Sequence, residues 1–275
     1  MTKIAVLVVT VAALLACFLG ALVLFRHTLI YPFVEVPLSK QVGLADGLIE
    51  IAAADGTPLS AWAAAPEDGR PVILAFGGNG GYLAGEVARL DPYRRAGYGV
   101  VVLNYRGAGG APGSPQEAKI IADAVALYDA MPDIDGFAAG ADGPPILYGA
   151  SLGAAVAVAL ATERTARALI LEAPFDRLCR VVETRMPIIP ACLILPDERW
   201  PSAERIAAVD APVLIVHGDA DRIVPFAHGR ALYEAAGPPK RFERIAGAGH
   251  NDLAGNGAPA VGRAFLEDIA AGAFD

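Results

Sequence analysis

The segment PPILYGASLGAA, residues 144–155, contains the most informative structural pattern of the chain. It predicts a short buried strand that ends at Tyr148, a sharp turn over residues 149–153, and an alanine-rich helix that begins at once. Small residues on both sides of Ser151 let the backbone turn tightly and leave the hydroxyl exposed. The helix aims its first backbone N–H groups at the place where an oxyanion would form. This context favours a nucleophile elbow over a glycine-rich turn with an incidental serine.

Length and composition restrict the classes of protein that this chain can represent. A chain of 275 residues is readily filled by one α/β domain, so we expect a single catalytic domain. The net charge of -8 and the lack of a long basic run argue against nucleic acid as a partner. Three cysteines without a C-x-x-C motif, together with four histidines, leave little for a structural metal. We therefore expect neither a metal nor a cofactor.

The first strongly patterned segment is apolar and lies near the N-terminus. Residues 4–25, IAVLVVTVAALLACFLGALVLF, carry no charge over 22 positions. As a helix they would extend about 33 Å, enough to cross the hydrocarbon core of a bilayer. We interpret residues 1–30 as an uncleaved membrane anchor and residues 31–275 as the catalytic domain. Two alternatives are a lipoprotein signal with Cys17 as the lipidated residue and a buried helix of a soluble protein.

The residues that flank the apolar segment bear on the orientation of this anchor. Lys3 lies before the apolar segment, whereas Arg26 and His27 follow it, so positive charge flanks both ends. We expect a single-pass membrane protein whose catalytic domain lies on the non-cytoplasmic side. In this orientation the N-terminal amine and Lys3 stay inside while the folded domain is carried across.

After residue 47 the chain alternates between strand-like and helix-like segments. Two short runs separated by a D-G turn predict a hairpin, and later apolar runs predict strands that are buried on both faces. The predicted strands are residues 48–52, 59–65, 71–76, 99–105, 144–148, 168–172, 212–216 and 242–245. The predicted helices are residues 82–95, 114–130 with Ser114 as the N-cap and Pro115 at the first position, 152–163, 226–236 and a last helix that ends near residue 270. This order favours a mostly parallel sheet that helices cover on both faces.

A glycine-rich loop, GGNGG at residues 77–81, follows the strand at 71–76. It is not a P-loop, because no Lys-Ser/Thr pair follows it, and it lacks the G-x-G-x-x-G spacing of dinucleotide-binding loops. An oxyanion-hole loop fits the position better, because such a loop brings a backbone N–H close to the nucleophile. The predicted donors are the backbone N–H groups of Asn79 and of Leu152, the residue after the serine.

The regular alternation stops over residues 175–211. This stretch contains MPIIPACLILP, residues 186–196, which is apolar but interrupted by prolines that prevent one regular helix. We expect a cap insertion whose apolar surface lines a cavity for the acyl group of a substrate. Cys179 and Cys192 lie within it, and we expect two unlinked apolar cysteines in preference to a disulfide.

The chain from about residue 48 onward resembles an α/β-hydrolase, in which serine, acid and histidine follow one another in that order. The segments HGDADRIVP (217–225) and GAGHND (247–252) resemble the acid and histidine loops of a membrane-anchored subgroup that includes depalmitoylating thioesterases and related serine esterases. NYRGAGG (104–110) and SPQE (114–117) also resemble that subgroup. Two positions depart from it. The subgroup usually has His-Gly where this chain has Gly77-Gly78, and Asp where it has Asn104.

Chemical roles follow from this arrangement. Ser151 needs a base to attack a carbonyl, and His250, on a glycine-flanked loop after the last predicted strand, is the candidate. Asp221 matches the position of the family acid, while Asp219 and Glu172 are alternatives. Two other histidines are given structural roles: we expect His217 to pack at a strand end and His228 to lie on an exposed helix. His27 is interpreted as a membrane-interface residue.

Together these features predict a membrane-anchored serine hydrolase that cleaves carboxylic esters or thioesters through an acyl-enzyme. The expected partners are a small-molecule or lipid-like acyl ester and the membrane. A peptidase or amidase with the same three residues is one alternative. A non-catalytic binding module with a hydrolase fold is the other, although such modules normally lose one of the three residues.

Overall fold

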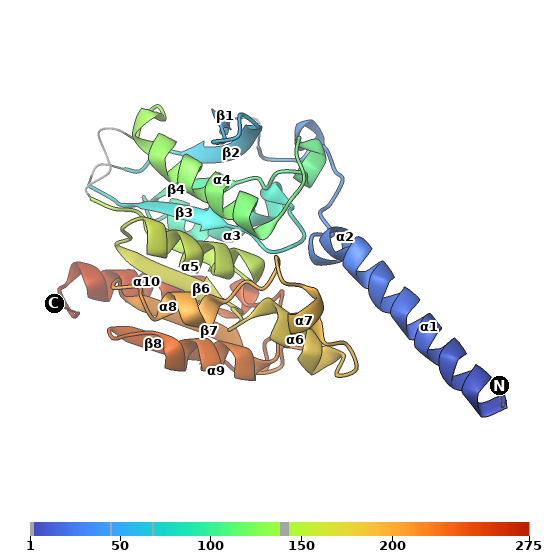
Figure 1. Ribbon diagram of the computed structural model, residues 1–275. Coiled ribbons are helices and arrows are strands. Elements are labelled where there is room, and N and C mark those ends of the chain that lie inside the picture. Colours follow the sequence, from blue (N-terminus) through green and yellow to red (C-terminus); the bar gives the residue numbers. More distant parts are fainter. Residues whose placement is uncertain (1–2, 45, 68, 138–142, 275) are drawn as a thin grey trace.

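The sheet dominates the architecture of the computed structural model, which describes residues 3–44, 46–67, 69–137 and 143–274. Within these ranges, eight strands form one sheet in the order β1-β2-β4-β3-β5-β6-β7-β8 (Figure 1). The strands are β1 (Leu48–Ala52), β2 (Pro58–Ala64), β3 (Val72–Phe76), β4 (Gly99–Leu103), β5 (Ile146–Ala150), β6 (Ala168–Glu172), β7 (Val213–Gly218) and β8 (Lys240–Ile245).

Strand directions divide the sheet into a hairpin edge and a parallel body. β1 and β2 pair antiparallel across the predicted D-G turn, and β2 pairs antiparallel with β4. All the remaining neighbours, from β4 through β3 to β8, pair in parallel. Every residue of β3, β4, β5 and β6 is buried, as continuous apolar runs require when helices cover both faces. The predicted hairpin and the mostly parallel sheet are therefore confirmed.

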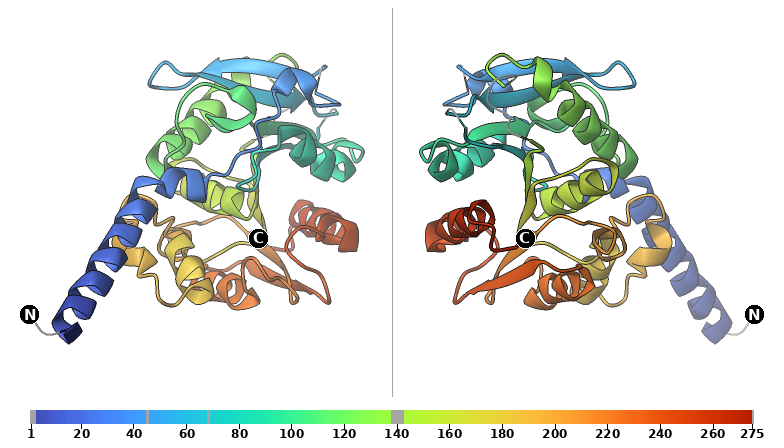
Figure 2. Two further views of the ribbon diagram at one scale, coloured as in Figure 1. Left: turned by 90° about the vertical axis from the view of Figure 1, so that its right-hand side faces the viewer. Right: turned by 90° about the vertical axis from the view of Figure 1, so that its left-hand side faces the viewer.

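Helices cover both faces of the sheet (Figure 2). On one face, α3 (Leu83–Arg94) and α10 (Ala258–Ala270) pack in the core cluster that contains Tyr93 and Phe265. The opposite face carries α4 (Glu117–Ala130), α5 (Leu152–Glu163), α8 (Ser202–Ile206) and α9 (Phe226–Ala235). One-turn helices η1 (Leu38–Lys40), η2 (Ala108–Gly110), η3 (Met131–Asp133) and η4 (Ala254–Asn256) lie in connections.

The start of α4 differs from the prediction. The helix begins at Glu117 after an extended Gln116, so neither Ser114 as the N-cap nor Pro115 at the first helical position is correct. The side chain of Glu117 does not reach back to Ser114. It accepts hydrogen bonds from the Trp200 backbone N–H at 2.8 Å and from Arg205 at 2.7 Å, so a tertiary contact replaces the capping box.

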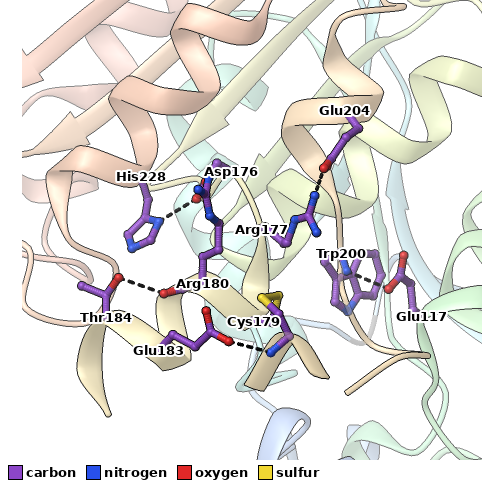
Figure 3. Close-up of a disulfide and its surroundings, with 11 residues drawn as sticks. Glu117, Asp176, Arg177, Cys179, Arg180, Glu183, Thr184, Trp200, Glu204 and His228 are labelled. Atoms are coloured by element: carbon purple, nitrogen blue, oxygen red, sulfur yellow. Dashed lines mark hydrogen bonds and ion pairs between the residues drawn. A yellow bond between two sulfur atoms is a disulfide. The ribbon is translucent and has the colours of Figure 1, made fainter. Parts of the chain in front are cut away.

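The cap consists of short helices, as the prolines predict. It contains α6 (Leu178–Arg185) and α7 (Ala191–Ile194), followed by the extended chain that leads to α8. The expectation of unlinked cysteines is wrong, because Cys179 and Cys192 form a disulfide with a Cα–Cα distance of 4.8 Å (Figure 3). The turn between α6 and α7 folds back and brings the two residues together, although they are 13 positions apart in sequence.

The N-terminal segment forms α1 (Lys3–Leu24), which projects away from the sheet and the helices that cover it (Figure 1). The most apolar 18-residue window of this helix has a mean hydropathy of 2.9, and none of that window is buried. By length and composition this helix could cross a membrane. A short helix, α2 (Arg26–Ile30), follows α1 and precedes the chain that leads to the sheet.

Candidate active site

Ser151 lies on the turn between β5 and α5 in a strained backbone conformation. Its φ is 53° and its ψ is -114°, a left-handed φ that few residues other than glycine adopt. The Ser151 backbone N–H donates to the Glu172 carbonyl at 2.8 Å, which ties the turn to the end of β6. A Cβ on Gly149 would collide with the Gly153 carbonyl, and a Cβ on Gly153 would collide with the Phe76 carbonyl. Both glycines are needed because the turn packs directly on neighbouring backbone.

The glycine-rich loop after β3 lies beside this turn. A Cβ built on Gly78 would lie 3.9 Å from the Ser151 Cβ, so the two segments are in van der Waals range. The Tyr105 hydroxyl donates to the Gly77 carbonyl at 2.7 Å and fixes the start of the loop. Asn79 is an exposed residue of this loop, and Leu152 is the first residue of α5, so the Leu152 N–H has no acceptor within the helix. The structure thus brings both predicted oxyanion donors to the neighbourhood of Ser151.

Asp221 is the acid that contacts His250. The His250 Nδ1 lies 2.7 Å from the Asp221 Oδ2, at the loops that follow β7 and β8. The other carboxylate oxygen, Oδ1, accepts hydrogen bonds from the backbone N–H groups of Ile223 and Val224, both at 2.8 Å. These bonds hold the carboxylate in one orientation, and this in turn orients the imidazole.

His217 contributes a further contact that the sequence did not reveal. It is fully buried at the end of β7, as expected, but its Nε2 also lies 3.3 Å from the Asp221 Oδ2 and 3.0 Å from the Val224 carbonyl. Burial raises the pKa of Asp221, but hydrogen bonds from His217 and His250 outweigh burial and hold the pKa below its ordinary value. Asp221 is therefore an anion over the neutral pH range.

The two alternative acids have other partners. The Asp219 carboxylate accepts the Gly247 backbone N–H at 2.7 Å and faces Arg244 at 3.6 Å. Glu172 is buried at the end of β6 and pairs with Arg89 at 3.1 Å. Burial raises its pKa despite the opposing charge of Arg89. Of the three candidates, Asp221 is the residue bonded to His250.

A cavity of about 300 Å³ lies beside Ser151 and His250, and we call it the polar cavity because charged side chains line part of it. Ser151 and His250 both line it, together with the ion pair of Arg89 and Glu172 and the loop that carries Asn79. Arg89 also contacts Glu86 at 3.2 Å, so its guanidinium is held between two carboxylates. The cavity can accommodate a polar group close to the Ser151 hydroxyl.

A second cavity, of about 510 Å³ and mainly apolar, borders Ser151 on the side of the cap. Ser151, Asn79 and Ile223 line both cavities. The cap contributes an apolar wall, as the sequence predicted, and α1 and α2 contribute another. The lining residues from these two parts are Leu178, Val181, Val182, Met186, Ile189, Ala191, Ile194 and Leu195 of the cap, and Phe18, Leu22, Arg26, Leu29 and Ile30 of the N-terminal helices.

The position of His228 differs from the prediction. It is buried on α9, where an exposed position was predicted, and its Nδ1 lies 2.6 Å from the Asp176 Oδ1 (Figure 3). Asp176 also accepts from Arg180 of α6 at 2.9 Å. The pair therefore links α9 to the base of the cap. No local sequence signal indicates this contact, because the two residues are 52 positions apart.

Among the residues that the structure describes, no group of three or more His, Cys, Asp or Glu side chains is arranged to hold a metal ion. Neither cavity that borders Ser151 presents such a cluster.

Comparison with curated proteins gives relatives along most of the chain. It is 35% identical over 253 residues to "Uncharacterized protein Rv2307c" of Mycobacterium tuberculosis, covering 88% of each chain. It is 33% identical over 195 residues to "Lysophosphatidylserine lipase ABHD12" of Danio rerio, covering 63% of this chain and 49% of the lipase. It is 35% identical over 156 residues to "Alpha/beta hydrolase domain-containing protein 17C" of Mus musculus, covering 54% of this chain and 44% of that protein. The chain thus spans about half the length of the last two relatives.

Comparison with solved structures gives the same fold. Est1E of Butyrivibrio proteoclasticus with bound ferulic acid superposes with a TM-score of 0.67 at 19% identity, over 81% of this chain and 99% of Est1E. The esterase Pf2001 of Pyrococcus furiosus superposes with a TM-score of 0.62 at 18% identity, over 81% of this chain and 90% of the esterase. No family model matches the sequence.

Proposed function

The chain belongs to the α/β-hydrolase superfamily and is a serine hydrolase of the esterase type, and we propose that it cleaves carboxylic esters or thioesters through an acyl-enzyme on Ser151. One observation carries this proposal: Ser151, on a strained turn, shares a cavity with His250, and His250 is bonded to Asp221. The elbow presents the hydroxyl, and the carboxylate fixes the imidazole.

In the proposed reaction, His250 takes the proton of the Ser151 hydroxyl as the oxygen attacks the carbonyl carbon of the ester. The Asp221 anion holds the imidazole in the tautomer with Nδ1–H and stabilises the cation that forms. The N–H groups of Asn79 and Leu152 stabilise the negative oxygen of the tetrahedral intermediate. His250 then protonates the leaving alcohol or thiol, and water hydrolyses the acyl-enzyme by the same steps.

The two cavities support an amphiphilic substrate. The apolar cavity has room for an alkyl chain, and each methylene buried there contributes about 0.8 kcal/mol. The polar cavity offers charged and amide groups to the alcohol or thiol part. Because Ser151 lines both, a carbonyl placed at this residue has the acyl chain on one side and the polar part on the other.

Membrane anchoring by α1 is part of the proposal, as is a non-cytoplasmic position for the catalytic domain. The disulfide between Cys179 and Cys192 supports this side, because disulfides persist in oxidising compartments. An alkaline-phosphatase fusion made after residue 40 should be active in a bacterial host. If this fusion is inactive and a cytoplasmic reporter fused at the same position is active, the catalytic domain lies on the cytoplasmic side and the proposed orientation is wrong.

Labelling with a fluorophosphonate probe tests the activity itself. Wild-type protein should be labelled, and the Ser151→Ala variant should not. The matched control is Ser114→Ala, which removes an exposed serine in the loop before α4 and should leave labelling unchanged. The proposal fails if the wild-type protein stays unlabelled under conditions that label other serine hydrolases.

A further inference from the structure

We propose that the cap and the end of the anchor form one membrane-embedded rim, and that the acyl chain of the substrate enters the apolar cavity sideways from the bilayer. This inference rests on the proposed ester hydrolysis and names where the substrate resides. The rim consists of the exposed apolar side chains of Phe25, Leu29, Met186, Ile188 and Leu193.

The first observation is that the apolar cavity has a wall made by the anchor helix itself. Phe18 and Leu22 lie one helical turn apart on the same face of α1, and both line the cavity that contains Ser151. Leu22 also packs against the cap cluster that contains Ile189. The last turns of the candidate membrane span are therefore part of the binding site, so the cavity begins at the depth of the hydrocarbon core.

The second observation is the distribution of apolar side chains in the cap. Ile188 is 84% exposed and Leu193 is 78% exposed, although their neighbours Ile189 and Leu195 are buried. Ile188 lies in the turn before α7, and Leu193 lies in α7. Two large aliphatic side chains exposed so close together in the cap are costly in water and are typical of contact with lipid. Figure 1 shows α6 and α7 on the side of the domain from which α1 projects. The same bilayer can therefore cover both surfaces.

The polar residues at the junction mark the level of the membrane surface. Arg26 directs its guanidinium to the Val23 carbonyl at 2.8 Å and to Asp197 at 3.8 Å. A long cationic side chain at the end of a span commonly reaches back to the interface in this way. Arg26 also lines the apolar cavity, so the interface lies beside the cavity rather than far from it.

A buried cluster fixes the anchor to the cap, so the wall is not a loosely attached helix. The Tyr31 hydroxyl donates to the Glu198 carboxylate and accepts from the Trp200 Nε1 at 3.1 Å. His27 of α2 lies 3.3 Å from the same carboxylate. These contacts hold α2 against the chain that follows α7, and they keep Leu22 facing the cavity. We call this set the anchor–cap cluster.

Two substrates distinguish the entry of an ester from the bilayer from the hydrolysis step itself. The first is 4-methylumbelliferyl palmitate in phosphatidylcholine vesicles, and the second is water-soluble p-nitrophenyl acetate, both with the full-length protein reconstituted in the vesicles. The double variant Ile188→Asp, Leu193→Asp should lower turnover of the palmitate ester at least about tenfold, because two charges oppose insertion of the rim. Turnover of the acetate should stay within about twofold, because both side chains are exposed and line neither cavity.

The matched control is Val42→Asp, a change at an 89% exposed apolar residue in the loop before β1 that should affect neither substrate. As a second variant, Leu22→Trp should lower kcat/KM about fourfold for each methylene it displaces from the cavity. Leu24→Trp, at an exposed position of the same helix, should leave the dependence of kcat/KM on acyl-chain length unchanged.

Equal losses for both substrates in the double variant, or none, would overturn the membrane-embedded rim. Leu22→Trp and Leu24→Trp giving the same chain-length series would overturn the anchor wall. Failure of the underlying hydrolysis would look different, because wild-type Ser151 would then resist the fluorophosphonate probe and acetate would not be turned over.

Discussion

The two cavities that border Ser151 are built from different parts of the molecule. The polar cavity is formed mainly by loops at the carboxyl ends of strands, such as the loop with Asn79 and the loop with His250. The apolar cavity is formed mainly by the cap, α1 and α2, which lie outside the sheet. In the proposed reaction, the reacting groups are thus held by backbone next to the sheet, whereas the site for the acyl chain is formed by segments that are attached to the sheet.

This difference implies that chemistry and substrate choice are separable. A change at a strand end should alter the rate for every ester, whatever its chain length. A change at a residue of the cap or the anchor that lines the apolar cavity should alter the dependence on chain length and leave the shortest esters nearly unaffected. The predictions that follow test this division, beginning with the largest expected effect.

The largest effect is expected at Asp221. Asp221→Asn should lower kcat by about 10⁴-fold for short and long esters alike, because an amide cannot hold the imidazole in the required tautomer. Asp219→Asn is the matched control, since Asp219 bonds to the Gly247 backbone and not to His250, and it should cost far less. The measurement is steady-state hydrolysis of p-nitrophenyl acetate and octanoate. Similar modest losses in the two variants would show that Asp221 is not the acid of the site.

A substitution at Ile189 tests the role of the apolar cavity. Its side chain is 4% exposed and lines the apolar cavity, so Ile189→Asp places an unpaired charge next to the acyl chain. For wild-type protein, kcat/KM should rise from acetate to a medium-chain ester, by up to about fourfold per methylene. In the variant this series should become flat, with acetate turnover and fluorophosphonate labelling retained.

The adjacent Ile188→Asp change serves as the control, because Ile188 points away from the cavity and is 84% exposed. It should leave the series for soluble esters unchanged. A wild-type enzyme that prefers acetate and does not respond to Ile189→Asp would instead favour a small polar ester as the substrate.

The difference between the sheet with its loops and the attached cap and anchor also explains which features could be predicted from the sequence. The hairpin, the parallel strands and the elbow depend on local signals: a D-G turn, continuous apolar runs and small residues around Ser151. In the parallel body of the sheet, the carboxyl ends of the strands meet at one edge. This geometry, together with the resemblance to α/β-hydrolases, is why Asp221 was favoured over Asp219 and Glu172 as the partner of His250.

The contacts of the cap and anchor could not be predicted in this way, because they depend on tertiary packing. The disulfide forms because the turn after α6 folds back, which the prolines permit but do not specify. Glu117 has a helix-start signature in sequence, yet its carboxylate binds Trp200 across the molecule. His228 is buried against Asp176 for the same reason. In each case a long-range contact overrides the local signal.

The smallest effect concerns Glu198, in the anchor–cap cluster beside the apolar cavity. This carboxyl group is fully buried, and burial raises its pKa from 4.5 to about 7. The folded protein therefore holds a proton that the unfolded chain releases, and the free energy of unfolding should fall as the pH rises from about 4.5 to about 7, by at most about 1.4 kcal/mol per pH unit.

Glu198→Gln keeps an oxygen that can accept from Tyr31 and from the Glu117 N–H, but it cannot ionise. The free energy of unfolding of wild type should therefore fall relative to that of the variant as the pH rises from about 4.5 to about 7. Above this range the difference between the two proteins should become constant. Thermal unfolding in detergent between pH 5 and pH 8 measures this difference, and Glu50→Gln, on the exposed side of β1, is the control. Because the cluster positions the anchor wall, the same rise in pH should lower the ratio of long-chain to acetate kcat/KM by a few fold in wild type only. If this ratio changes equally in Glu198→Gln, ionisation of Glu198 does not cause the change. The anchor–cap cluster would then not position the acyl site, and the shape of the apolar cavity would depend on the cap alone.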